Sequence, residues 1–128
     1  MADFEPVFQE LRAILEPYAE EMEVNADTPT KYGLQTHWRR PEDGYPGYFG
    51  SVKTGKRYVS FHLMPVYAFP TLLEDVSPDL LRRMQGKSCF NFTRCDEVLF
   101  DELRLLTRRG YERYASAGLL GDEGPLRD

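Results

Sequence analysis

Residues 47–64 read GYFGSVKTGKRYVSFHLM, and the prediction of the fold starts from the pattern of this segment. Segments 47–54 and 57–64 mix apolar and polar side chains in short alternating runs, and Thr54-Gly55 lies between them. Alternation with a period of two predicts β-strands, and a connection this short predicts an antiparallel hairpin. The hairpin in turn predicts an antiparallel sheet with one apolar face and one polar face.

The same pattern extends to both sides of this hairpin. Strands are predicted at about 22–27 and 31–38, followed by the turn-rich loop 41–47, and a short strand at 88–92. Apolar residues at spacings of three and four predict a first helix from Phe4 to about Glu16 and a last helix over about 96–117. Ser77-Pro78 predicts the start of a short helix that runs to about Met84. The predicted class is α+β, a curved antiparallel sheet of about five strands with the N- and C-terminal helices packed on one face.

Length and composition predict a single domain. The 128 residues are 41% hydrophobic, enough for one compact core, which we place at residues 1–120 with a frayed tail at 121–128. Two cysteines, Cys89 and Cys95, are too few for a disulfide scaffold and are interpreted as reduced thiols. The first residues resemble no signal peptide and no stretch is long and apolar enough to span a membrane, so we expect a cytoplasmic protein without membrane contact.

Charge is segregated along the chain. Residues 1–27 carry eight acidic residues against Arg12 alone, whereas residues 28–113 carry fourteen Lys or Arg against ten acids. The net charge of −5 argues against general nucleic-acid binding, which depends on neutralising phosphates. We therefore expect no nucleic-acid partner.

The strand at 57–64 supplies the main candidate site. Its apolar residues alternate with a row of polar residues that has no role in a core. The simpler interpretation is that this row lies on a solvated face of the sheet. The sharper interpretation is a concave, partly basic face that holds a small anionic molecule or contacts a protein partner. The predicted ligand-binding residues are Lys53, Tyr58, Ser60, His62, Lys87 and Asn91. An exposed sheet edge could also serve oligomerisation.

Metal binding and catalysis have weaker support in the sequence. His37, His62 and Cys89 are capable transition-metal ligands, but their spacing is uninformative. The acidic first helix offers oxygen ligands for a hard cation or iron at Glu16, Glu20 and Glu23, although such runs are usually solvated helix faces. Cys89 could act as a nucleophile with His62 or His37 as base, yet no catalytic motif surrounds it, so no catalytic residue is assigned and we expect a non-enzymatic domain.

The order of elements, together with MPVYAF (64–69) and MQGKSCFNF (84–92), resembles the YdhG-like family over residues 4 to about 115. That family consists of small bacterial domains of largely unassigned function, some of them described as frataxin-like iron chaperones. The resemblance implies helices on one side of a curved antiparallel sheet and iron handling through acidic residues. The Pro- and Gly-rich loop 41–47 departs from the family pattern. A frataxin-like iron-binding chaperone and a small Cys-dependent enzyme are therefore the alternatives to the binding domain.

Overall fold

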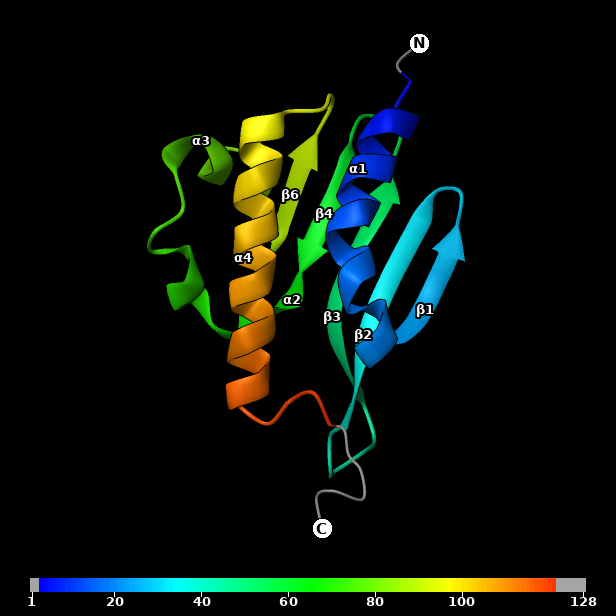
Figure 1. The fold of residues 1–128 in the computed structure, drawn as a ribbon, viewed down its shortest axis with the longest axis vertical. Helices are drawn as coiled ribbons and strands as arrows, with labels where there is room; N and C mark the ends of the chain where they lie inside the picture. The colour runs from blue at the N-terminus through cyan, green and yellow to red at the C-terminus, as the bar shows by residue number, and fades with distance from the viewer. Residues whose placement is uncertain (1–2, 122–128) are drawn as a thin grey trace.

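The computed structural model describes residues 3–121 as two layers, with one antiparallel sheet packed against helices (Figure 1). The strand order across the sheet is β1-β2-β3-β4-β6-β5. The strands are β1 (Glu23–Thr28), β2 (Lys31–Arg39), β3 (Pro46–Thr54), β4 (Val59–Leu63), β5 (Met84–Gln85) and β6 (Cys89–Phe92). The α-helices are α1 (Glu5–Leu15), α2 (Met64–Ala68), α3 (Pro78–Leu81) and α4 (Glu97–Ser116), with 3-10 turns η1 (Glu16–Glu21) and η2 (Pro70–Leu73).

The predicted α+β class is confirmed, because α1 and α4 lie side by side on one face of the sheet (Figure 1). The prediction of about five strands was one short, since the described residues form six. The extra strand is β5, which pairs with β6 through Met84 opposite Phe90. The predicted tail lies outside the described residues except for Gly121.

Two predicted elements end earlier than expected. The strand predicted at 57–64 covers only Val59–Leu63, because Met64 starts α2 and Pro65, in the first turn of that helix, has no N–H for a sheet ladder. The helix predicted from Ser77 to about Met84 stops at Leu81, although Ser77 does cap it by accepting a bond from the Leu80 amide at 3.2 Å. Gly86, with φ of 78°, serves the β5–β6 turn and not a helix end.

The core forms between the helices and the apolar rows of the central strands. Phe8, Leu11 and Leu15 from α1 and Leu103 from α4 are fully buried, as is Phe61 from β4. The glycine at position 110 lets α4 pack closely against Pro65 in α2, because a Cβ atom at this position would lie 2.9 Å from the Pro65 Cβ. This close contact fixes α4 over the end of β4.

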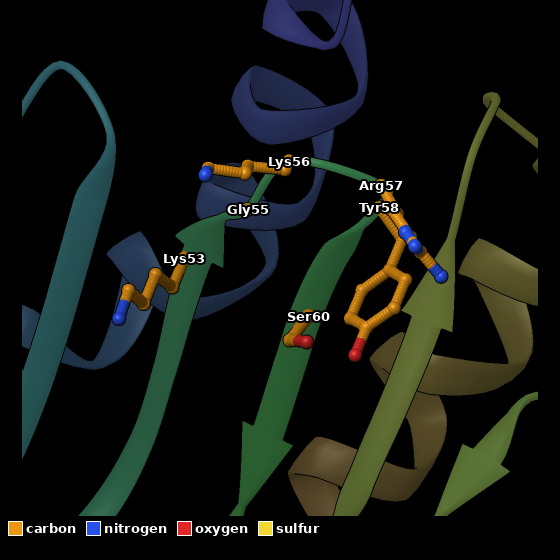
Figure 2. A pocket seen from close by; sticks show the side chains of 6 residues that line it. All are labelled: Lys53, Gly55, Lys56, Arg57, Tyr58 and Ser60. Carbon is orange, nitrogen blue, oxygen red and sulfur yellow. The ribbon is translucent and has the colours of Figure 1, made fainter.

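The other face of the sheet carries the polar rows of the alternating strands. In β4, Val59, Phe61 and Leu63 are buried, whereas Ser60 and His62 between them are half-buried. The view from this side places α1 and α4 behind the strands (Figure 2). We call this surface the open face, and it holds the residues that the sequence singled out.

Candidate functional site

The register of the strands aligns the polar residues of the open face into rows. One row runs from Lys31 through Lys53 and Ser60 to Asn91, each directly opposite the next on the neighbouring strand. The next row, two residues along each strand, runs from Gly33 through Ser51 and His62 to Cys89. Residues on the same face and directly opposite one another have Cβ atoms about 5 Å apart, so the side chains within each row are neighbours.

A pocket of about 390 Å³ lies on the open face where β3 joins β4. We call it the hairpin pocket; its lining residues are Lys53, Gly55, Lys56, Arg57, Tyr58 and Ser60. Figure 2 shows Lys53 and Lys56 extending to one side of the hairpin, toward β2, while Arg57 and Tyr58 extend toward β6. Ser60 lies between the two groups, so the pocket has cations on both sides and a hydroxyl between them.

The cations of the hairpin pocket have no acidic partner among the residues that the structure describes. None of the ion pairs within residues 3–121 includes Lys53, Lys56 or Arg57. Lys31 is likewise absent from these pairs, and it lies directly opposite Lys53 across the β2–β3 ladder. Like charges directly opposite each other destabilise a sheet, so this arrangement leaves positive charge that an anion would relieve.

A ladder of hydrogen bonds lies beside these cations. The Tyr58 hydroxyl donates to Oε1 of Gln85 at 3.3 Å, and Nδ2 of Asn91 donates to the same oxygen at 2.8 Å. The Ser60 hydroxyl donates to Oδ1 of Asn91 at 2.7 Å. Both amide oxygens are therefore occupied, and within the described residues the Gln85 amide nitrogen donates to no group. The ladder adds neutral N–H donors to the positive charge of the pocket.

His62 and Cys89 form a second polar contact on the open face. Nδ1 of His62 lies 3.2 Å from the Cys89 Sγ and 3.2 Å from the Ser88 Oγ. Burial lowers the pKa of His62 and raises the pKa of Cys89, so both groups favour their neutral forms. A thiol and a hydroxyl can each donate to Nδ1, and in the tautomer that accepts such a bond the proton of the neutral ring lies on Nε2.

A smaller pocket of about 140 Å³ lies next to the hairpin pocket. We call it the His62 pocket; its polar lining consists of Asn25, Lys31, Ser51 and His62, and Leu34, Tyr48, Gly50 and Met64 supply the rest. Lys31 on this pocket is the cross-strand partner of Lys53 on the hairpin pocket. The two lysines therefore stand at the boundary between the two pockets.

The structure brings most of the predicted ligand-binding residues together. Lys53, Tyr58 and Ser60 line the hairpin pocket, and Asn91 bonds to Ser60. His62 lines the neighbouring pocket. Lys87 is not brought to them, because it lies in the β5–β6 turn before Cys89, at the end of β4 away from Lys53.

The sequence interpretation missed three residues of this site, Lys56, Arg57 and Gln85. A signal for the first two was present, since Lys53, Lys56 and Arg57 are three cations within five residues around a predicted turn. Gln85 carried no signal, because β5 is only two residues long and was predicted as the region after a helix.

The predicted acidic cation site is not assembled. Glu16 bonds to Arg12 at 2.8 Å, and Glu20 is exposed in η1. Glu23 lies on β1, where a hydrogen bond from Arg39 at 2.7 Å is the main cause that lowers its pKa to about 2. Within residues 3–121, no three His, Cys, Asp or Glu side chains are grouped so that they could hold a metal ion.

Comparisons with known proteins add no relative. The sequence matches no family model, and searches of curated proteins and of solved structures gave no significant match. Among the described residues, no helix has the length and apolar character needed to cross a membrane.

Proposed function

We propose that this protein binds a small anionic ligand in the hairpin pocket and acts as a binding or accessory domain. The observation that carries this proposal is the set of Lys53, Lys56 and Arg57, which line one pocket without an acidic partner in the described chain. Arg and Lys bind carboxylate and phosphate oxygens through short charge-assisted hydrogen bonds. A ligand of this class would neutralise the site and pair its donors.

The N–H groups that the Tyr58–Gln85–Asn91 ladder leaves over suit the same ligand, whereas the Ser60 hydroxyl donates its proton to Asn91. Hydrogen bonds inside the ladder fix the orientation of the side chains, which lowers the entropy cost of ordering them around a bound group. The ladder also gives the pocket a neutral side. An oxyanion bound between Lys53 and Arg57 would lie within this arrangement of charged and neutral donors.

A Cys-dependent enzyme is the second candidate, and the 3.2 Å contact between Cys89 Sγ and His62 Nδ1 is the observation that favours it. A nucleophilic cysteine has to be a thiolate, which a protonated imidazole or another cation normally stabilises. Here burial shifts both pKa values the opposite way, toward thiol and neutral imidazole. The contact therefore supports a hydrogen-bonded structural pair better than a nucleophile and its base.

The iron-binding alternative rests on the acidic N-terminal segment and on the resemblance to the YdhG-like family. Both stay predictions. The placement of Glu16, Glu20 and Glu23 adds no support, because two of the three carboxylates bond to arginines. Anaerobic titration with ferrous iron tests it, and saturable binding that Glu16→Gln and Glu23→Gln abolish would favour this alternative over anion binding.

Isothermal titration calorimetry with inorganic phosphate tests the proposed function. We expect saturable binding that weakens at least tenfold in Lys53→Gln and in Arg57→Gln, because each variant removes one charge-assisted contact. Lys87→Gln is the matched control, since it removes the same charge at an exposed position in the β5–β6 turn, outside the pocket. Equal weakening by all three variants would reveal a general charge effect and would contradict a site in the hairpin pocket.

A further inference from the structure

The two pockets of the open face are close enough for one small molecule to reach both. Ser60 lines the hairpin pocket and His62 lines the His62 pocket, and they are two residues apart on β4. Two residues along a strand correspond to about 7 Å. The cross-strand pair of Lys31 and Lys53 joins the pockets on the other side. A ligand of the length of a phosphorylated sugar spans this distance.

The chemistry of the two pockets differs. The hairpin pocket has three cations, whereas the His62 pocket has Lys31 alone at its border. The rest of the polar lining of the His62 pocket is neutral, and it includes the Ser51 hydroxyl. In the tautomer whose Nδ1 accepts from Ser88 or Cys89, the His62 ring offers an Nε2–H donor. The described residues give Nε2 no hydrogen-bond partner.

Apolar groups complete the His62 pocket. Leu34, Tyr48 and Met64 contribute to its lining, and no carboxylate does. A small pocket with an apolar wall and a few neutral donors suits an uncharged group that carries hydroxyl or carbonyl oxygens. A second fully ionised group fits less well, because Lys31 is the one cation among the described residues that line this pocket.

From these observations we infer that the ligand is a phosphomonoester with a hydroxyl- or carbonyl-bearing body, the phosphate lying in the hairpin pocket and the body reaching the His62 pocket. This inference rests on the proposed function. A phosphate matches the hairpin pocket better than a carboxylate, because its three terminal oxygens and double negative charge can pair with more than one of the cations Lys53, Lys56 and Arg57. These side chains are exposed and extend to opposite sides of the hairpin, so binding requires them to turn toward the phosphate. The neutral donors of the His62 pocket then discriminate between phosphomonoesters that differ in the uncharged part of the molecule.

The test compares inorganic phosphate with ribose 5-phosphate by calorimetry on the wild-type chain and on two His62 variants. His62→Gln retains an amide N–H near the position of Nε2, whereas His62→Met has similar length and no donor. We expect ribose 5-phosphate to bind about tenfold more tightly than inorganic phosphate, with that gain kept in His62→Gln and reduced about three- to tenfold in His62→Met. Inorganic phosphate should bind all three proteins equally.

The outcomes separate this inference from the proposed function. If phosphate binds in a Lys53-dependent manner but ribose 5-phosphate binds no more tightly, the proposed function stands and the inference is wrong. It is also wrong if His62→Met binds ribose 5-phosphate as the wild type does. If phosphate does not bind at all, the proposed function is wrong, and the inference that rests on it is wrong as well. Circular-dichroism melting of each variant confirms that it is folded before its affinity is compared.

Discussion

Lys53→Glu should make the unliganded protein more stable, although Lys53 is exposed and makes no ion pair within residues 3–121. Lys31 lies directly opposite it, so the wild-type chain holds a like-charge cross-strand pair. The substitution removes that repulsion and creates an attractive pair at the same place. Each of the two contributions is about 0.2–1 kcal/mol, so the gain in unfolding free energy is about 0.4–2 kcal/mol.

Urea unfolding at low salt, followed by circular dichroism, measures this gain. Lys87→Glu is the control, because it changes the net charge equally on a residue outside both pockets. High salt should shrink the difference between the two variants, since exposed charges are screened over about 10 Å at 0.1 M. Phosphate should stabilise the wild type and not Lys53→Glu. A Lys53→Glu variant no more stable than Lys87→Glu would refute the idea that the site stores unrelieved repulsion.

Three further predictions concern other parts of the fold. Gly110→Ala should destabilise the protein by about 1 kcal/mol in urea unfolding, because the added Cβ would lie 2.9 Å from the Pro65 Cβ. The overpacking costs about 1–3 kcal/mol, which exceeds the gain of about 1 kcal/mol in helix propensity. Glu23→Gln should lower the urea midpoint at pH 7 and have a much smaller effect at pH 2. A carboxylate whose folded pKa is about 2 stabilises the fold fully above its ordinary value of 4.5 and loses that contribution as the pH falls through about 2. Cys89 should react with iodoacetamide at pH 7.5 more slowly than free cysteine, because burial raises its pKa.

Each of these predictions has a control and a contradicting result. Arg109→Ala tests an exposed position next to Gly110, and a Gly110→Ala variant that gains stability would show that α4 does not need the close contact. If Glu23→Gln lowers the urea midpoint equally at pH 7 and pH 2, the ion pair of Glu23 with Arg39 is not the cause of the lost stability. The thiol measurement is made in a Cys95→Ser background. Alkylation of Cys89 faster than that of free cysteine would support the enzyme alternative.

The sheet and its helices could be predicted from periodicity, because the alternation of Val59, Phe61 and Leu63 and the helical spacing of apolar residues are local properties. The end of the strand at Leu63 was harder to predict, since Met64 continues the alternation of the strand. Pro65 is the one local sign that a helix begins there. The two-residue strand β5 could not be predicted. It exists because β6 offers a free edge to pair with, which is a tertiary property.

In the candidate site, too, the features set by local sequence could be predicted and those set by tertiary pairing could not. The polar row of β4 was visible from the sequence, and the register then placed Lys31 and Lys53 opposite each other and set Asn91 against Ser60. Register depends on pairing between distant segments, so no single strand reveals it. Lys87 was grouped with Lys53 because the two lie in strands or turns expected to neighbour the candidate strand, but the antiparallel register separates them along it. Knowing which segments neighbour a strand does not show which of its ends a given residue lies near.

The proposed function requires that the hairpin pocket binds an oxyanion. An NMR titration of ¹⁵N-labelled protein with inorganic phosphate, at constant ionic strength set by chloride, tests it most directly. We predict saturable shifts of the backbone amides of Gly55, Lys56, Arg57 and Ser60, with Gly86 and Lys87 unchanged. Shifts that grow linearly without saturation, or that centre on the β5–β6 turn, would contradict the claim.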